Sequence, residues 1–589
     1  MDENYIIVIV LIVIMILFFS LNNINKPNNH VIVIGSGLAG LSATITILEK
    51  GGKVILIEKQ SSLGGNSAKA SSGINGTVTK QQKYKQVEDS LEKFYKDTVK
   101  SSSRDNEPYF TLIDQLVNKS GSAITWLENK GVNLNDIAIL GGHSESRTHR
   151  PDTNVLAGIE IISKLVKHLD NYKSNLTIKK NTKVIRILKD NNNILGVEYE
   201  SENNISKKLY ASSVILTTGG YANDHSKMSL LHKHRPDLKS LPTTNSNATT
   251  GDGIKLGMLL GALTRDMEEI QVHPTGFIDD EDPTNKTKTL CGEVMRGVGG
   301  ILLNSEGERF CNELGTRQYV VDQMSKFTNK TFYIVLNEQA VENVKSHLNH
   351  YMSNNLIKKI GNGDDVSKKM GFNKNKLETT LKKYNDSIKT KKDTFGKTIF
   401  PVSFSMKDTF YVGKITPVLH YCMGGLQINK DCQVLSENGV LNNLYAAGEV
   451  TSGIHGANRL GGNSLLECNV YGRIAGEQAL KKLHLLPKFP ISFSLFSGIS
   501  DWISNLSPTK LIKVKKYTLE EVGSHNSETD AWMVIDNNVY DVTKYINVHP
   551  GGRDAIIRYA GKDATKEFYQ IHEKYMLDDL KPIGIVNKN

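Results

Sequence analysis

Three glycines and one acid near the start of the chain have the types and spacing of a nucleotide-binding site. Gly35, Gly37 and Gly40 form a G-x-G-x-x-G pattern, and Glu58 lies 18 residues beyond the last glycine. In such a loop the glycines allow a tight turn, close approach of the backbone to a pyrophosphate, and close packing of a helix on a sheet. An acid at about this distance binds ribose hydroxyls. These residues predict a dinucleotide site.

The elements needed to position these residues are present in the right order. An apolar segment, 31–34, precedes the glycines, a helical pattern follows them, and a second apolar segment, 54–57, ends at Glu58. This order predicts a strand–helix–strand unit, in which the first N–H groups of the helix and its dipole bind phosphate.

A second group of residues that could take part in catalysis or binding lies between His273 and Arg317. It contains Glu293 and Arg296 and sits among glycine-rich strand ends at turn-like positions. Taken singly, such residues are more often surface charges or satisfied polar groups. Their interpretation therefore depends on the pattern they form together.

Two histidines near the C-terminus form a third candidate group. His549 begins the sequence HPGG, and His572 follows the segment AGKDAT at residues 560–565. Two histidines without such flanking segments would be interpreted as surface residues. The segments HPGG and AGKDAT make a shared role of the two histidines the better interpretation.

Composition limits the class of protein. At 589 residues the chain is too long for one core, so two to four domains are expected. Residues 517–589 hold 12 acidic and 8 basic residues, a net charge of −4, which leaves +14 on residues 1–516. This asymmetry is compatible equally with electrostatic docking of an acidic tail on a basic body and with solubility alone.

The lysines lack interleaved aromatic residues, so nucleic-acid binding is disfavoured. The five cysteines show no disulfide framework, which favours a reducing compartment.

Residues 5–21 are almost purely apolar and uncharged, at the lower limit of a membrane span. A cleaved signal peptide is the alternative, but the acidic start and the Asn-rich exit favour a retained single-pass anchor. Lys26 lies on the C-terminal side, which places the body in the cytosol by the positive-inside rule. We expect a membrane of the endoplasmic reticulum or mitochondrion, with the body in a reducing compartment.

Several further segments carry a family resemblance. They are 63–67 (LGGNS), 70–75 (ASSGIN), 420–425 (HYCMGG), 444–450 (LYAAGEV) and 455–465 (HGANRLGGNSL). Together with the segment from Gln271 to Arg317, they resemble the flavoproteins of the fumarate reductase and succinate dehydrogenase superfamily, and the soluble fumarate reductases best. The resemblance implies an α/β fold: a Rossmann-like FAD-binding domain with an inserted α+β capping domain.

The resemblance also implies the cofactor and its contacts. Members of membrane complexes carry a histidine bonded covalently to FAD where this chain has Asn66-Ser67-Ala68, so we expect non-covalent FAD. The implied FAD-binding residues are Gly35, Ser36, Gly37, Ala39, Gly40, Glu58, Lys59, Gly65, Asn66, Ser67, Gly73, Ile74, Thr218, Gly219, Asp252, Glu449, Asn463, Ser464 and Leu465.

For the substrate, the resemblance implies fumarate or a similar small dicarboxylate. His273, His420 and Arg459 would hold its carboxylates, since a guanidinium binds carboxylate bidentately. Reduced FAD would deliver hydride to one alkene carbon from N5, and Arg317 would protonate the other. Glu293 and Arg296 would return a proton to Arg317.

Three positions depart from the family pattern. Gly292 replaces a threonine found in some relatives, so one carboxylate contact is missing or moved. Cys422 replaces the threonine of HxTMGG, and Gln318 replaces the aspartate that follows the acid arginine.

The tail resembles cytochrome b5 over its full length, which implies an α+β heme domain. His549 and His572 would be the axial ligands of heme b, an arrangement suited to electron transfer rather than oxygen binding. Electrons would pass from an NAD(P)H-dependent reductase of the cytochrome b5 reductase type to the heme and then to FAD.

The expected organisation is a transmembrane anchor (5–21), an FAD-binding domain in two parts (30–236 and 401–480), a capping domain (237–400), a linker (481–516) and a heme domain (517–586). Two alternatives remain: a reductase of another alkenoic acid, or a membrane-anchored flavin–heme electron relay with an inactive alkene site.

Overall fold

The structure is a computed structural model that describes residues 30–153, 155–201, 205–485, 515–546, 549, 552–572, 577 and 580–587. The chain divides into two compact units, Met1–Leu486 and Pro487–Asn589, and each is described by itself. The apolar segment 5–21 lies outside the described residues. Within the described ranges, no helix is both long enough and apolar enough to cross a bilayer.

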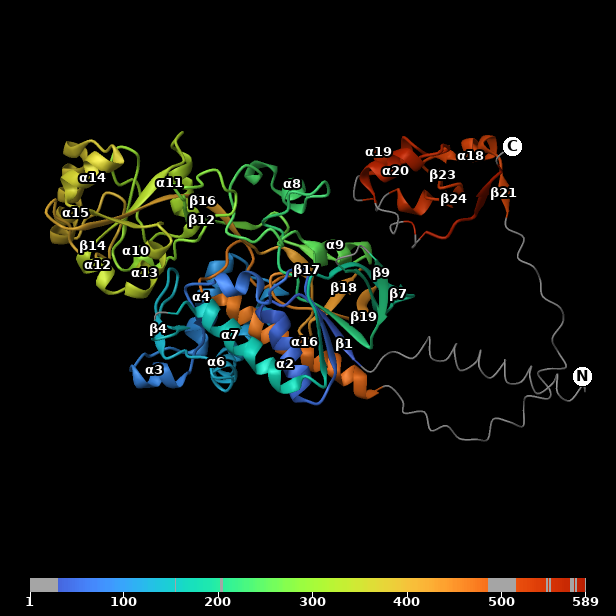
Figure 1. Cartoon of the computed structure of the whole chain (residues 1–589), viewed down its shortest axis with the longest axis horizontal. Helices are drawn as coiled ribbons and strands as arrows, with labels where there is room; N and C mark the ends of the chain where they lie inside the picture. The colour runs from blue at the N-terminus through green and yellow to red at the C-terminus, as the bar shows by residue number, and fades with distance from the viewer. Residues whose placement is uncertain are drawn as a thin grey trace, which may run out of the picture. The chain divides into compact units, whose positions relative to one another are not determined.

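The first unit is built on a mostly parallel sheet. Its five parallel strands stand in the order β6 (Leu176–Lys179), β2 (Val54–Ile57), β1 (Val31–Ile34), β10 (Ser213–Leu216) and β19 (Gly439–Ala446). All residues of β1 and β10 are buried, as expected for strands covered on both faces. The predicted strand–helix–strand unit is present, and β1 lies between β2 and β10 in the sheet (Figure 1).

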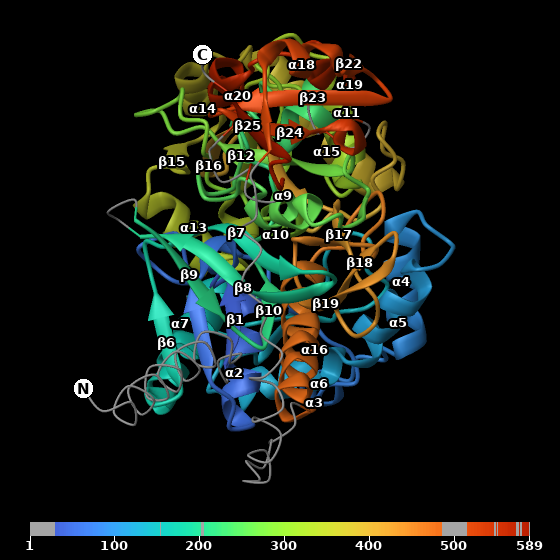
Figure 2. The same cartoon turned by 90° about the vertical axis from the view of Figure 1, so that its right-hand side faces the viewer.

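Two helices cover one face of this sheet and pack closely on each other. They are α2 (Leu38–Glu49) and α16 (Asn463–Leu485), which run side by side in Figures 1 and 2. Gly472 and Gly476 of α16 face the backbone of α2, where an added Cβ would lie 2.4 Å from the Ala39 carbonyl oxygen and 2.7 Å from that of Ala43. The two glycines therefore allow the contact that brings the start of α16 beside the nucleotide loop.

An antiparallel extension continues the sheet. It consists of the hairpin of β7 (Lys183–Asp190) and β8 (Asn193–Glu200), and β9 (Ser206–Tyr210) pairs with β8. The remaining elements outside the cap are η1 (Gly65–Lys69), β3 (Ile74–Asn75), α3 (Lys80–Tyr84), α4 (Leu91–Ser102), α5 (Tyr109–Asn118), α6 (Ser120–Glu128), β4 (Asp136–Ala138), β5 (Thr148–Arg150), α7 (Ala157–His168), η2 (Leu169–Tyr172), α8 (Leu230–His234), η3 (Pro236–Leu238), α9 (Asp252–Leu259), β11 (Thr264–Arg265), β17 (Gly425–Gln427), β18 (Gln433–Ser436) and β20 (Thr451–Ser452).

A second sheet with its own core forms the cap. It consists of β12 (Ile270–Phe277), β16 (Phe410–Cys422), β14 (Phe332–Asn337) and β13 (Ile301–Leu303), all antiparallel, with β15 (Lys358–Gly361) also paired to β16. Its helices are α10 (Val294–Gly297), α11 (Arg317–Ser325), α12 (Glu338–Glu342), α13 (Lys345–Ser353), α14 (Gly363–Met370) and α15 (Lys374–Thr390). The sequence assigned residues 401–480 to the FAD-binding domain, but β16 lies in the cap sheet.

The second unit is a small α+β fold. Its sheet is β21 (Lys516–Tyr517), β25 (Gly584–Val586), β24 (Asn538–Asp541), β23 (Asp530–Ile535) and β22 (Asn526–Ser527), with helices α18 (Leu519–Ser524), α19 (Arg553–Ile557) and α20 (Thr565–Ile571) and the short η5 (Thr543–Tyr545). β23 and β24 form a hairpin, and its turn residues Asp536 and Asn537 have φ of 51° and 63°. Two central residues with positive φ are typical of the type I′ turn that joins tight hairpins.

Candidate active site

The glycine loop after β1 forms the floor of a first cavity. Gly35 has φ of +99°, and a Cβ there would lie 2.4 Å from the Thr217 carbonyl oxygen. A Cβ on Gly40 would lie 1.9 Å from the Gly35 carbonyl oxygen. Only glycine fits these two positions, so the loop turns sharply and directs the N-terminus of α2 into the cavity.

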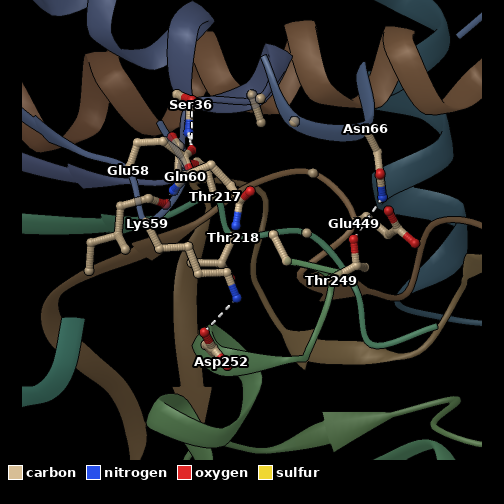
Figure 3. Close-up of a pocket in the computed structure, with 18 of the residues that line it drawn as sticks. Ser36, Glu58, Lys59, Gln60, Asn66, Thr217, Thr218, Thr249, Asp252 and Glu449 are labelled. Atoms are coloured by element: carbon tan, nitrogen blue, oxygen red, sulfur yellow. Dashed lines mark hydrogen bonds and ion pairs between the residues drawn. The ribbon is translucent and has the colours of Figure 1, made fainter. Parts of the chain in front are cut away.

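Most of the predicted FAD residues line this cavity. They are Gly35, Ser36, Gly37, Ala39, Glu58, Lys59, Gly65, Asn66, Ser67, Thr218, Gly219, Asp252 and Glu449. Glu58 accepts hydrogen bonds from Ser36 N (3.0 Å), Ser36 Oγ (2.6 Å) and Gln60 N (2.9 Å) (Figure 3). These contacts fix the carboxylate at the end of β2, where the sequence predicts a ribose site.

Polar bonds across the cavity hold its opposite wall. Lys59 Nζ lies 2.8 Å from Asp252 Oδ2, and Asn66 Nδ2 donates to Thr249 Oγ1 (2.9 Å) (Figure 3). Asn66 Nδ2 also donates to Asn245 Oδ1 (2.6 Å). Asn66 thus uses its amide to hold the segment before α9, at the position where covalent relatives would need a histidine.

The cavity also offers unfilled donors and open backbone. Thr218 Oγ1 is buried without a hydrogen-bond partner among the described residues, and Gly219, with φ of +75°, has no atom within 4 Å of an added Cβ. A flat, polar ligand is needed to fill this space, so the residues present fit a flavin dinucleotide.

Six predicted FAD residues lie elsewhere. Gly73, Ser464 and Leu465 line an adjoining cavity rather than the first one. Gly40, Ile74 and Asn463 line neither: Gly40 packs against Gly35, Ile74 pairs with His149 in a small sheet, and Asn463 accepts a hydrogen bond from Asn75 (2.7 Å).

The second cavity is continuous with the first. Asn66, Ser67, Glu449 and Cys468 line both. Burial raises the pKa of Glu449 to about 7, although its carboxylate accepts a hydrogen bond from Cys422 N (2.9 Å). The second cavity lies between the cap and the FAD-binding part, which is where a substrate would meet the cofactor.

Two guanidinium groups from different elements meet in this second cavity. Arg317, at the start of α11, donates to Gln271 Oε1 (2.5 Å), and Arg459 donates to the same oxygen (3.1 Å). Both arginines line the cavity. Gln271 was not a predicted site residue, and it joins the predicted acid to the predicted clamp.

Glu293 holds Arg317 from the other side. Its Oε2 accepts from Arg317 Nε (3.0 Å) and Nη2 (2.9 Å), and its Oε1 accepts from Gly141 N (3.0 Å). Burial opposes ionisation of this carboxyl, but the charges of Arg317 and Arg296 outweigh burial and lower its pKa to about 2. Glu293 is therefore a carboxylate at neutral pH, bonded at both oxygens.

Arg296, the third predicted catalytic residue, lies farther from Glu293 than Arg317 does. Its Nη2 lies 3.9 Å from Glu293 Oε2, and its Nη1 donates to the Glu313 carbonyl oxygen (2.6 Å). Glu313 itself is fully buried in ion pairs with Arg309 (2.7 Å) and Lys397 (2.9 Å). Arg296 is 1% exposed, so this conformation gives it no direct contact with solvent.

The two clamp histidines stand on paired strands, with ring centroids 5.4 Å apart. Thr275 N donates to His273 Nδ1 (3.2 Å), while His273 Nε2 is buried without a partner among the described residues. His420 Nδ1 lies 2.8 Å from Thr244 Oγ1. Burial, followed by the nearby arginines, lowers the pKa of each histidine well below its usual range, so both rings are neutral.

Arg459 is held by contacts that leave its charge uncompensated. Its guanidinium lies 4.4 Å from the centre of the Tyr421 ring, and the residue is 4% exposed. Burial, with the charge of Arg317, lowers its pKa to about 10. An anionic ligand would relieve this cost, so the surroundings of Arg459 suit a carboxylate.

The structure shows the contacts of the three residues that depart from the family pattern. Gln318 is exposed and donates to Asp322 (2.7 Å), away from the cavity. Cys422 Sγ is buried and accepts from Tyr221 N (3.3 Å). Gly292 N donates to the hydroxyl of Tyr351 (3.0 Å), a residue of α13 that was not among the predicted site residues.

In the second unit, the two predicted heme ligands lie together. His549 and His572 have ring centroids 5.6 Å apart, and His549 Nδ1 lies 3.3 Å from the Gly552 carbonyl oxygen. That carbonyl can only accept, so Nδ1 carries the proton and Nε2 keeps the lone pair that binds metal. Burial lowers the pKa of both histidines. These residues fit an axial pair for heme iron.

Comparisons with known proteins agree with these sites. Residues 30–465 match the FAD binding domain family, and residues 518–585 match the family described as cytochrome b5-like heme/steroid binding domain. A fumarate reductase of Schizosaccharomyces pombe is 43% identical over 78% of this chain and 92% of its own length. Fumarate reductase 1 of Saccharomyces cerevisiae is 42% identical over 76% and 97%. The open conformation of a flavocytochrome c3 fumarate reductase aligns with TM-score 0.66 and 32% identity over 78% of this chain and 79% of its own.

The fold and its two sites define a flavoprotein oxidoreductase with an attached heme module. The chain belongs to the FAD binding domain family, in the group that contains the fumarate reductases, and carries a C-terminal cytochrome b5-like domain. FAD and heme are its cofactors.

Proposed function

We propose that this chain reduces fumarate, or a similar small alkene dicarboxylate, to the saturated dicarboxylate. The observation that carries the proposal is the shared contact of Arg317 and Arg459 with Gln271 in a cavity continuous with the FAD site. The fumarate reductases of the two yeasts, each matched over more than nine-tenths of its length, support the same substrate.

The charges in the cavity suit a dianion. Arg317 is paired with Glu293, whereas Arg459 contacts only the neutral Gln271 amide and the Tyr421 ring through the bonds described. One carboxylate of the substrate would neutralise Arg459. The neutral His273 would donate from Nε2, because its Nδ1 accepts from the Thr275 backbone.

The reaction adds a hydride and a proton across the alkene. FAD, once reduced, supplies the hydride. Arg317 would supply the proton: a guanidinium is a very weak acid, but the carbanion-like transition state is a base strong enough to take its proton. Glu293, an ionised carboxylate 2.9 Å from Arg317, would then take up a proton from solvent and pass it to the deprotonated guanidine, with Arg296 at 3.9 Å as the next group.

Electrons would reach this site one at a time through the heme at His549 and His572. A reductase of the NAD(P)H-dependent cytochrome b5 reductase type is the proposed donor.

On the apolar segment 5–21 we further propose a single-pass anchor in the endoplasmic reticulum or mitochondrial membrane, with the body in the cytosol. Deletion of residues 1–29 should release the protein from membranes extracted with alkaline carbonate.

The test of the proposed reaction is fumarate-dependent oxidation of a reduced viologen dye by the purified protein without oxygen. Arg317→Ala should lower kcat by about a thousandfold or more, since a positioned acid contributes about 10² to 10⁴. Arg186→Ala is the matched control, because Arg186 also forms a two-nitrogen bond to a glutamate (Glu198 Oε2, 2.6 and 3.0 Å) but lies in the β7–β8 hairpin. Retained turnover in Arg317→Ala would contradict the acid assignment. Absence of turnover in the natural chain would favour an electron relay.

A further inference from the structure

Two hydroxyl groups lie side by side in the substrate cavity beside Gly292. Tyr351, from α13 of the cap, is 1% exposed, and Ser71, from the segment after η1, is 5% exposed. Both residues line the cavity together with His273 and Arg317. They come from parts of the chain that no sequence motif connects.

Gly292 makes room for these hydroxyls. Its N–H donates to Tyr351 Oη (3.0 Å), and a Cβ at this position would lie 3.1 Å from Ser71 Oγ and 3.4 Å from Tyr351 Oη. The two hydroxyls therefore occupy the space that a side chain at residue 292 would enter. Gly292 has no side chain that could supply a polar group here, and the hydroxyls of residues 71 and 351 supply it instead.

This pair of hydroxyls has a proton to give. Tyr351 Oη accepts from Gly292 N, and burial raises the pKa of this phenol, so its proton is retained, although the neighbouring Ser71 hydroxyl acts on the pKa in the opposite direction. Ser71 Oγ is buried, and it makes no hydrogen bond of normal geometry within the described residues. When one of the two hydroxyls donates to the other, the second O–H is left for an acceptor, which an oxygen of the ligand would supply.

The charges explain what these donors would bind. At this end of the cavity Arg317 is already paired with Glu293, and His273 is neutral. A carboxylate here cannot rely on an unpaired cation, whereas the carboxylate at Arg459 can. Neutral O–H and N–H donors are the groups left to hold it.

We propose that the hydroxyls of Tyr351 and Ser71 bind the second carboxylate of the substrate, and that they make the site select dicarboxylates over monocarboxylates. The inference rests on the proposed alkene reduction and specifies which residues set its substrate class. A site built from donors rejects a substrate that lacks the acceptor, because the donors are then buried unpaired.

The experiment compares fumarate with acrylate, a monocarboxylate alkene, in the dye assay with full-length protein. Tyr351→Phe and Ser71→Ala should each lower kcat/KM for fumarate about ten- to a hundredfold, mainly through KM, as expected for loss of a hydrogen bond to a charged group. Acrylate turnover should change less than threefold, so the ratio of the two values falls. Tyr384→Phe is the control, because Tyr384 is equally buried in the cap core, has an unpaired hydroxyl, and does not line the cavity.

A second substitution tests direct contact. The backbone of Gly292 lies outside the left-handed region, so Gly292→Ser in the Tyr351→Phe background can place a hydroxyl in the vacated space. Recovery of the fumarate-to-acrylate ratio supports the proposal. A ratio that stays at the Tyr351→Phe value in folded, flavin-bound protein counts against it.

The outcomes separate this inference from the proposed function. If the natural chain reduces fumarate but Tyr351→Phe and Ser71→Ala leave the ratio unchanged, the inference is wrong and the proposed reaction stands. If Tyr351→Phe does not fold, Ser71→Ala alone decides. If the natural chain reduces no alkene, the proposed function itself fails.

Discussion

His273 and His420 in the substrate cavity, and His549 and His572 in the C-terminal unit, are two imidazole pairs with nearly equal spacing. Their ring centroids lie 5.4 Å and 5.6 Å apart, and both pairs meet edge to face. Spacing alone would not tell a substrate clamp from a pair of metal ligands.

The partner of Nδ1 separates the two kinds of histidine. The Thr275 N–H donates to Nδ1 of His273, which places the ring proton on Nε2. The Gly552 carbonyl accepts from Nδ1 of His549, which leaves the lone pair on Nε2. The first ring can donate to a carboxylate and the second can bind iron, so one backbone group next to each ring selects its chemistry.

The largest effect is expected at the heme pair. His549→Ala and His572→Ala should each abolish the heme absorbance and all turnover driven by a cytochrome b5 reductase, because iron loses an axial ligand. Turnover with reduced dye should persist. His525→Ala, which removes a histidine stacked on Trp532 in the same unit, should keep the heme. A retained heme band in either ligand variant would contradict the assignment.

His273→Ala should lower kcat/KM for fumarate about a hundredfold, since the Nε2–H bond to a carboxylate is lost. His273→Gln should recover part of this loss, because its amide also donates. FAD and heme spectra measured alongside should be unchanged. An equal loss of kcat/KM in both variants would show that a hydrogen bond donated by residue 273 does not determine fumarate binding.

Gly141→Ala should have a smaller effect, about tenfold on kcat. A Cβ at residue 141 would lie 2.4 Å from Glu293 Oε1 and displace the carboxylate that holds Arg317. Gly297→Ala is the control, because no atom lies within 4 Å of its added Cβ. Equal rates in both variants would contradict a positioning role for the Gly141 backbone.

The smallest effect is on pH dependence. A clamp histidine of ordinary pKa would gain charge and tighten substrate binding as pH falls through about 6.5. The pKa values of His273 and His420 are lowered well below that, whereas the pKa of Glu449, which also lines the cavity, is about 7. In a Glu449→Gln background KM for fumarate should therefore show no step between pH 6 and 8. A fall in KM centred near pH 6.5 would mean that a clamp histidine titrates there.

The FAD site could be predicted from sequence because backbone geometry does most of its work. Gly35, Gly37 and Glu58 lie in one contiguous unit, whose spacing alone specifies the turn, the helix start and the acid. The other predicted residues that line the cavity, from Gly65 to Glu449, were implied by the family resemblance instead. Gly40 packs against Gly35 behind the loop, whereas Ile74 and Asn463 belong to other motifs and line neither cavity.

The substrate cavity was less accessible to sequence analysis. Gln271 adjoins a recognised motif, yet nothing local indicates that its amide joins Arg317 to Arg459. Tyr351 lies in a polar helical stretch, and its place in the cavity depends on how α13 packs in the cap. Such contacts arise from tertiary packing of elements distant in sequence, which single-sequence patterns do not encode.

The pairing of β12 with β16 constrains the length of the chain as well as its residue types. The ladder shifts register between Gln271 and Val272 and again between His273 and Gly276, and every residue of β12 is buried. Removing one residue between Ile270 and Phe277 would exchange the faces of the strand and turn His273 out of the cavity. The exposed segment 281–285 carries no such limit. Insertions and deletions should therefore be tolerated in that loop and not within the strand.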